Sequence, residues 1–213
     1  MPVHYIKEIN AGLRIGLWKI EESTKNLYDR TILNHEERSK FTGFTNDRRK
    51  REWLATRCLL QQMLPEVTIQ YCENGKPSLN KAGPYISLSH TRGWVLVVLS
   101  DKNGVGCDIE IMSPKVLRIK DKFASDQEQH LAENHNSKLA YYTLIWSAKE
   151  AIYKQKFHEE FLEFKTQISI IPENELDKEG MLTAEVSMLK GKKSIKLNYL
   201  VADEYVLVYT LND

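Results

Sequence analysis

The chain has 213 residues, which is enough for one large domain or two small ones. Its composition, 42% hydrophobic and 28% charged, is typical of a globular protein and excludes a disordered chain. The formal net charge is +1, from 30 basic and 29 acidic residues. This balance gives no overall attraction to nucleic acid or to an acidic membrane, so we expect neither as a partner.

Targeting signals and cysteine usage favour a cytoplasmic protein. The first ten residues lack the basic and apolar regions of a signal peptide, and no apolar run approaches the roughly 18 residues of a membrane helix. The three cysteines, Cys58, Cys72 and Cys107, are odd in number and lack the spacing of a zinc site. We therefore expect the three cysteines to act as small apolar residues in a reducing compartment.

The first half of the chain is predicted to hold one strand, then three helices, then three strands. In order, these are a strand over 12–20, helices over 22–33, 34–41 and 46–64, and strands over 67–72, 85–90 and 94–99. Asn34 and Glu37 have the spacing of a capping box. The 94–99 segment is apolar at every position, which is typical of a strand buried on both faces.

A basic run, Arg48-Arg49-Lys50-Arg51, occupies the first turns of the third helix. Such a run is most often a solvated helix face. Basic side chains at a helix N-terminus oppose the helix dipole, however, and a bound anion would relieve that conflict. An anion site, which Arg38 and Lys40 could join, is therefore the functional interpretation.

The second half repeats this order of elements. It is predicted to hold a strand over 106–110, helices over 125–133 and 137–156, and strands over 167–171, 182–187, 195–200 and 205–211. Because both halves run from a strand through helices to a hairpin-like pair, we expect two similar α+β halves, 1–102 and 103–213.

Acidic and basic residues converge on two elements of the second half. Alternation in a strand places Asp108 and Glu110 on one face. In the helix, residues four apart place Trp146, Glu150 and Lys154 on one side, with Lys149 beside them. Three neighbouring carboxylates repel one another unless a cation neutralises them, and oxygen ligands favour magnesium. The pattern predicts a divalent cation and a phosphorylated ligand.

Each part of this pattern also has a plain structural explanation. Asp108 and Glu110 could be a solvated strand face. Glu150 and Lys154 could be a surface ion pair worth about 0.3–0.5 kcal/mol. The combination, and not either part alone, favours a functional site.

Four motifs together resemble a known family. They are Asn74-Gly75-Lys76-Pro77, Ser87-Leu88-Ser89-His90, Gly106-Cys107-Asp108-Ile109-Glu110 and the segment 146–154, WSAKEAIYK. Their order and spacing resemble those of the 4'-phosphopantetheinyl transferases, in the single-chain, Sfp-type branch. The resemblance implies two similar α/β halves related by a pseudo-two-fold axis, each a small, mainly antiparallel sheet packed with helices. Where the family commonly has Val or Ile, this chain has Cys107, which we expect to be a small core residue.

The resemblance also implies an activity. The 4'-phosphopantetheine arm of coenzyme A would be transferred to a serine of an apo acyl carrier or peptidyl carrier protein, releasing adenosine 3',5'-bisphosphate. Magnesium would be the cofactor, with manganese as an alternative. The enzyme would be a monomer, with the nucleotide side in 1–102 and the catalytic side in 103–213.

Roles for individual residues follow from the same resemblance. The implied magnesium ligands are Asp108, Glu110 and Glu150. Glu150 would also be the general base, directly or through a water molecule, while Lys154 would contact the pyrophosphate with help from Lys149. The residues implied to bind the rest of coenzyme A are Lys76 and Pro77 at the nucleotide, and Ser89, His90, Lys40, Arg48 and Arg51 at the 3'-phosphate.

Two other functions compete with this prediction. A magnesium-dependent phosphoesterase would use the same carboxylates but would leave the 74–77 and 87–90 motifs without a role. A nucleic-acid-binding module built on the basic helix would leave the carboxylates unexplained, and the near-zero net charge argues against it.

Overall fold

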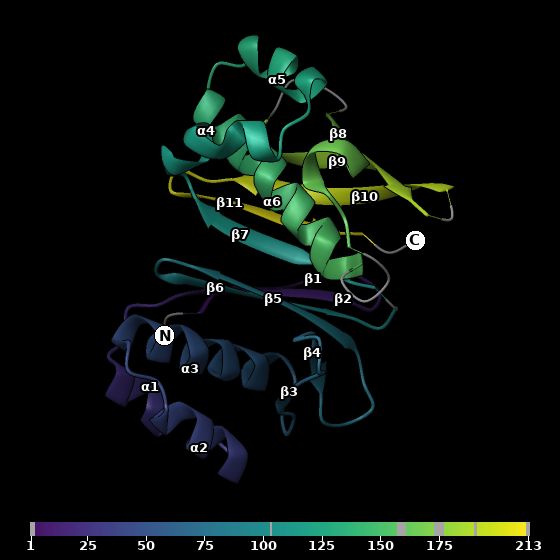
Figure 1. Cartoon of the computed structure of the whole chain (residues 1–213). Helices are drawn as coiled ribbons and strands as arrows, with labels where there is room; N and C mark the ends of the chain where they lie inside the picture. The colour runs from purple at the N-terminus through teal and green to yellow at the C-terminus, as the bar shows by residue number, and fades with distance from the viewer. Residues whose placement is uncertain (1–2, 103, 157–160, 173–176, 190, 212–213) are drawn as a thin grey trace. The chain divides into compact units, whose positions relative to one another are not determined.

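The computed structural model describes residues 3–102, 104–156, 161–172, 177–189 and 191–211. The chain divides into two compact units, Met1–Lys102 (unit 1) and Asn103–Asp213 (unit 2). Each unit has its own antiparallel sheet and its own long helix (Figure 1). The predicted α+β class is confirmed.

Unit 1 combines a four-stranded sheet with three helices and a small hairpin. Its elements are β1 (Val3–Asn10), β2 (Leu13–Lys19), α1 (Thr24–Arg30), α2 (His35–Thr42), α3 (Asp47–Met63), β3 (Ile69–Tyr71), β4 (Pro77–Leu79), β5 (Tyr85–Thr91) and β6 (Trp94–Ser100). The sheet order is β1-β2-β6-β5, and β3 pairs with β4 separately. In Figure 1, α3 lies along one face of this sheet.

The core of unit 1 lies between α3 and the two inner strands, β2 and β6. All seven residues of β6 are buried, as the apolar run at 94–99 predicted. Gly16 of β2 allows α3 to approach, because a methyl group there would lie 2.5 Å from Met63 Sδ and 2.9 Å from Leu59 Cδ1.

Unit 2 combines a five-stranded sheet with four α-helices and a 3-10 turn among its described residues. Its elements are β7 (Cys107–Ile111), α4 (Lys115–Ile119), η1 (Lys120–Lys122), α5 (Asp126–Glu133), α6 (Lys138–Lys156), α7 (Phe164–Gln167), β8 (Ile168–Pro172), β9 (Glu179–Met188), β10 (Gly191–Val201) and β11 (Tyr205–Thr210). The sheet order is β7-β11-β10-β9-β8, with every neighbouring pair antiparallel. Its core joins α6 to strand residues such as Val206 and Val208.

The two units share a chain topology. In each, the strand that precedes the helices pairs with the last strand, and the last strand pairs with the one before it, giving β2-β6-β5 in unit 1 and β7-β11-β10 in unit 2. In each, the long helix packs on the sheet. This common order supports the predicted repeat.

Several element boundaries differ from the prediction. The helix predicted over 22–33 ends at Arg30, because Thr31 has extended backbone angles and its N–H bonds back to the Tyr28 carbonyl. The capping box at Asn34 and Glu37 is confirmed, with the side-chain bond in each direction present.

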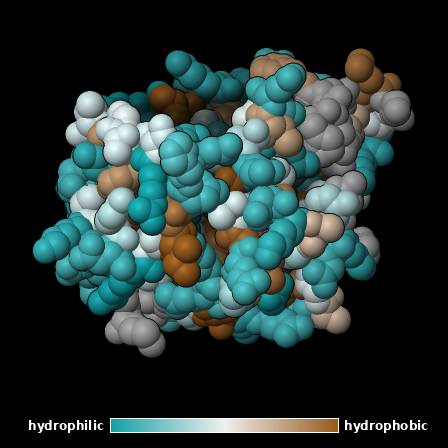
Figure 2. Space-filling view, turned by 90° about the horizontal axis from the view of Figure 1, so that it is seen from below, coloured by the Kyte–Doolittle hydropathy of each residue, from teal (hydrophilic) through white to brown (hydrophobic). Residues whose placement is uncertain are grey.

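The view in Figure 2 faces the helices of unit 1 and shows mainly hydrophilic residues, with hydrophobic side chains in small groups. Exposed apolar residues such as Ile32 and Tyr28 belong to this unit. Among the described helices, none combines the length and the hydropathy that crossing a bilayer requires.

Candidate active site

The edge strand β7 places two carboxylates on the sheet face that packs against α6. In the antiparallel register, Asp108 lies opposite Val208, and Glu110 lies opposite Val206. Residues directly opposite one another share a sheet face. Because Val206 and Val208 belong to the core that includes α6, the predicted shared face of Asp108 and Glu110 is the one next to this helix.

Gly106 allows β7 to begin unusually close to α6. A methyl group at Gly106 would overlap the carbonyl oxygen of Ala151 and lie 2.8 Å from the amide nitrogen of Gln155. The backbone of Gly106 is fixed by Thr210, whose Oγ1 accepts its N–H at 2.9 Å and whose N–H donates to its carbonyl at 2.9 Å. Only glycine therefore lets the strand meet the helix at the turn between Glu150 and Lys154.

An ion pair joins the two elements at this point. Lys154 Nζ donates to Asp108 Oδ1 at 2.7 Å, and Asp108 is only 3% exposed. Burial lowers the pKa of Lys154, but the charge of Asp108 and, less strongly, that of Glu150 outweigh burial, so the pKa is raised. Lys154 therefore stays charged in its site.

Glu150 lies close enough to Asp108 for the charge of Asp108 to change the pKa of Glu150. Burial is the main cause of a raised pKa for the Glu150 carboxyl, and repulsion from Asp108 raises it further, while Lys154 partly offsets both. Two carboxylates and one ammonium group thus lie together in a partly buried site. A cation bound beside the two carboxylates would relieve their repulsion.

The donors of this site fit magnesium. Carboxylate oxygens on Asp108 and Glu150, with Glu110 two residues along the same strand face, are hard ligands of the kind that Mg²⁺ prefers. Within the described part of the chain, no three His, Cys, Asp or Glu side chains form a ready-made metal site. A magnesium ion bound here would therefore need oxygens of water or of a ligand to complete its coordination.

Lys149 does not join these residues, and the expectation that it assists at the pyrophosphate is wrong. Its side chain is 0% exposed, and its Nζ donates to Glu128 Oε2 at 2.7 Å, Phe123 O at 2.8 Å and Phe164 O at 2.8 Å. An ammonium group has three donors, so none is left for a ligand. Trp146 lies on the same side of α6 as Lys149, and the centroid of its ring is 5.1 Å from that of Phe123 and 5.6 Å from that of Phe164.

In unit 1, the structure brings His90 of β5 together with the start of α3. Its Nδ1 lies 3.3 Å from Glu52 Oε2, and its Nε2 contacts Arg49. Arg48 Nε lies 3.6 Å from the other oxygen of Glu52. Burial raises the pKa of Glu52, although the neighbouring arginines act in the opposite direction. His90 and Arg48 are thus neighbours, because both lie beside the Glu52 carboxylate.

Arg51 was predicted from the sequence to bind the 3'-phosphate, whereas Arg49 and Glu52 were not among the predicted residues. Arg51 Nε lies 3.1 Å from Asp47 Oδ2, one turn back along α3, and Arg51 is partly buried. Helical spacing places positions 49, 52 and 53 on one face of α3, and Trp53 is buried on that face. This spacing could have been used to select Arg49 and Glu52 from the sequence.

Three further residues predicted to bind coenzyme A lie at the β3–β4 hairpin or beside it: Lys40, Lys76 and Pro77. Lys40 Nζ lies 4.5 Å from the ring centroid of Tyr71, and Pro77 pairs with Tyr71 in the β3–β4 hairpin. Lys76 lies in the turn of this hairpin, where its N–H donates to Asn74 Oδ1 at 3.1 Å. The structure therefore gathers Lys40 and Pro77 around an aromatic ring that the sequence analysis did not select.

Ser89 is the predicted residue that the structure separates from His90. It pairs with Leu96 of β6, whose neighbours Val95 and Val97 are the residues that pack toward α3. Alternation then places Ser89 on the other face of the sheet, away from the His90 cluster.

Comparisons with known proteins identify a family for most of unit 2. Residues 104–210 match the model of the 4'-phosphopantetheinyl transferase superfamily. The chain is 35% identical over 119 residues to the 4'-phosphopantetheinyl transferase AcpT of Salmonella typhimurium, covering 51% of this chain and 59% of the relative. It is 32% identical over 87 residues to the 4'-phosphopantetheinyl transferase ffp of Bacillus subtilis, covering 39% of this chain and 38% of the relative. The chain thus spans less than two thirds of the length of these relatives.

The family match covers half of the chain and contains the carboxylates, Gly106 and Lys154. The chain therefore belongs to the 4'-phosphopantetheinyl transferase superfamily.

Proposed function

We propose that this chain transfers the 4'-phosphopantetheine arm of coenzyme A to a serine hydroxyl of an apo acyl carrier or peptidyl carrier protein. The observation that carries the proposal is the meeting of Asp108, Glu150 and Lys154, from β7 and α6, inside the unit that matches the family. The relatives named above carry the name of this activity.

The carboxylates are proposed to hold the cofactor. Asp108, Glu110 and Glu150 would bind magnesium, or manganese as the alternative. When bound, the cation would neutralise the pyrophosphate of coenzyme A and polarise its phosphorus–oxygen bonds. The repulsion between the Asp108 and Glu150 carboxylates supports this assignment.

The protein side chains would supply proton transfer and charge stabilisation. Glu150 would accept the proton of the carrier serine, directly or through a water molecule, and because a carboxylate that binds a cation is a weaker base, the route through water carries equal weight. The serine oxygen then forms a bond to the phosphorus of the pantetheine phosphate as the bond to adenosine 3',5'-bisphosphate breaks. The ammonium of Lys154 would offset the charge that develops on the leaving phosphate.

Unit 1 is proposed to bind the nucleotide end of coenzyme A. His90, Arg48 and Arg49 form a cationic group suited to the 3'-phosphate, in which bound phosphate would exchange for some of the contacts with Glu52. Pro77, paired with Tyr71, suits the base and ribose, and Lys40, which lies over the Tyr71 ring, stays a predicted contact of the 3'-phosphate. Contacts from Lys76, Ser89 and Arg51, a monomeric state and a cytoplasmic location stay predictions.

One experiment separates this function from the competing phosphoesterase. The protein is incubated with coenzyme A and magnesium, with and without an apo acyl carrier protein, and adenosine 3',5'-bisphosphate is quantified by chromatography. A transferase releases it only when the apo carrier is present. Release at the same rate without a carrier would favour the phosphoesterase.

A further inference from the structure

Each unit contains one buried ion pair built in the same way. In both, a short helix begins with a capping box, and the glutamate of that box also binds a cation on the long helix that follows. The pairs are Glu37 with Arg57 in unit 1 and Glu128 with Lys149 in unit 2, separated by 20 and 21 residues. All four side chains are buried.

In unit 2, this pair ties α6 to several other segments. Besides Glu128, the ammonium of Lys149 binds the carbonyl oxygens at the end of η1 and at the start of α7. Glu128 is held in turn by two backbone N–H groups, those of Ser125 at 2.7 Å and Ile170 at 2.8 Å. One point on α6 is therefore fixed against η1, α5, α7 and β8.

Lys149 immediately precedes Glu150, a carboxylate of the candidate active site. Successive residues of a helix point about 100° apart, so Lys149 anchors one side of α6 while Glu150 faces β7. A rotation of α6 about its axis would change the distances from both Glu150 and Lys154 to Asp108. The contacts of Lys149 oppose such a rotation.

In unit 1, the corresponding pair acts on residues proposed to bind the nucleotide. Arg57 Nε donates to Glu37 Oε1 at 2.8 Å, and its guanidinium lies 3.3 Å from the centroid of the Trp53 ring. Arg57 also interacts electrostatically with Tyr71, the residue at which Lys40 lies. The same device thus supports a different part of the proposed site.

Buried ion pairs are a weak source of stability, because well-packed apolar residues stabilise a core at least as well. A pair retained on the long helix of each unit points instead to control of geometry. We infer that Lys149 and Glu128 are positioning residues that set the rotation of α6, and that Arg57 and Glu37 are their counterparts for the nucleotide side. The inference rests on the proposed function for both of its readouts, the affinity for Mn²⁺ and the kinetics of transfer.

The test compares two double variants of the full chain. Lys149→Met/Glu128→Met removes both charges of the unit 2 pair and keeps long, unbranched side chains, and Arg57→Met/Glu37→Met is the matched control. Affinity for Mn²⁺ is titrated in the presence of coenzyme A, and kcat and KM for coenzyme A are measured with an apo acyl carrier protein at saturating magnesium.

The two variants are expected to act on different quantities. The unit 2 variant should keep a native circular dichroism spectrum but lose about 10–100-fold in Mn²⁺ affinity and in kcat, with KM for coenzyme A within about twofold. The unit 1 variant should raise KM for coenzyme A while leaving Mn²⁺ affinity and kcat within about twofold.

A folded unit 2 variant with wild-type Mn²⁺ affinity and kcat would overturn the inference, as would equal effects of both variants on every quantity. If the unit 2 variant loses its native spectrum, Lys149→Arg decides: its planar guanidinium cannot direct three donors to the three acceptors, so wild-type Mn²⁺ affinity would again overturn the inference. A wild-type chain that binds Mn²⁺ but transfers nothing refutes the proposed function alone. A wild-type chain that binds no Mn²⁺ overturns both.

Discussion

Gly106 shows how a single missing side chain can create a site. Its hydrogen atom occupies space that any other residue would need, and the β7 strand can therefore reach the backbone of α6. Asp108, two residues further on, then lies within 2.7 Å of Lys154. The glycine of the GxDIE motif thus has a steric role, distinct from the chemistry of the carboxylates that follow it.

We predict that Gly106→Ala lowers the free energy of unfolding by about 2 kcal/mol or more, because the strand must move away from the helix. The same movement should reduce transfer. Urea denaturation followed by circular dichroism measures the stability. Gly83→Ala is the matched control, since a methyl group there meets nothing closer than 3.9 Å, and equal stability of the two variants would contradict the steric role.

Asp108 is the residue on which the charge balance of the site depends. Replacing it with Asn preserves its shape but removes the negative charge that binds Lys154 and the proposed cation. We predict that Asp108→Asn lowers kcat about 100-fold or more, with an unchanged circular dichroism spectrum.

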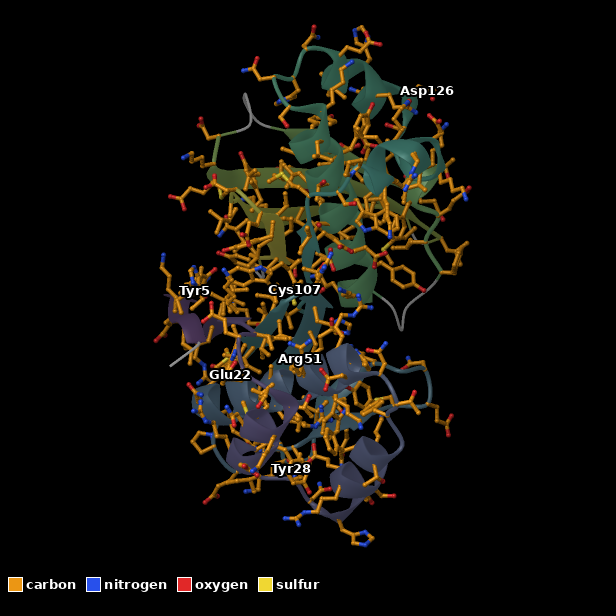
Figure 3. The ribbon with its side chains drawn as sticks, turned by 90° about the vertical axis from the view of Figure 1, so that its left-hand side faces the viewer. Tyr5, Glu22, Tyr28, Arg51, Cys107 and Asp126 are labelled. Atoms are coloured by element: carbon orange, nitrogen blue, oxygen red, sulfur yellow. The ribbon has the colours of Figure 1, made fainter. Side chains whose placement is uncertain are left out.

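The control for this variant is Asp126→Asn. Asp126 is an exposed carboxylate in α5, at the far end of unit 2 from Cys107 and β7 (Figure 3). Its variant should retain transfer within about twofold. Wild-type turnover in Asp108→Asn, measured in the same assay, would remove the argument for a metal site at β7.

At the scale of elements, two helices are joined to the rest of their units by buried charges. Lys149→Met alone would leave the Glu128 carboxylate buried without its cation, at a cost of about 3–5 kcal/mol in the free energy of unfolding. Adding Glu128→Met should restore most of that loss. Urea denaturation of both variants measures the difference, and a double variant no more stable than the single one would show that the ion pair is not what fails.

A separate prediction concerns the contacts between His90 of β5 and the start of α3. His90 contacts both Arg49 and Glu52, so His90→Ala would remove one proposed contact to a 3'-phosphate and disturb the contacts with these two residues. KM for coenzyme A should rise about tenfold or more, with a smaller effect on kcat. The exposed His130 of α5 supplies the control, and a selective loss of kcat in His90→Ala would place this histidine in the chemistry instead.

Strong periodic patterns were sufficient to predict the elements that build the site. The uniformly apolar β6 and the long α6 were recognised because their patterns extend over many residues. The edge strand β1 was missed: its segment ends in the polar residues Lys7, Glu8 and Asn10, and it pairs with a single neighbour. The five-residue α4 is too short to show a period.

The candidate site, like the fold, was predicted from the sequence only in part. Period-two and period-four spacing predicted that Asp108, Glu150 and Lys154 would meet, and the structure brings them together. The role of Lys149 could not be read locally, because its partner Glu128 lies 21 residues earlier in another helix. Local spacing indicates which way a side chain points, but it does not reveal what covers it.

At the scale of the whole molecule, two units of similar topology carry different chemistry. Unit 2 holds the carboxylates and Lys154, and unit 1 holds the basic residues proposed for the nucleotide. We predict that one chain of 24.8 kDa is the active species. Size-exclusion chromatography with light scattering should give that mass, and an obligate trimer would contradict the prediction.

The most direct test of the central proposal is the intact mass of a carrier protein. The chain is incubated with coenzyme A, magnesium and apo carriers of the acyl and peptidyl types, with and without EDTA. We predict that at least one carrier gains one phosphopantetheine, and that EDTA prevents this gain. No gain on any carrier, together with no binding of coenzyme A by calorimetry, would contradict the account.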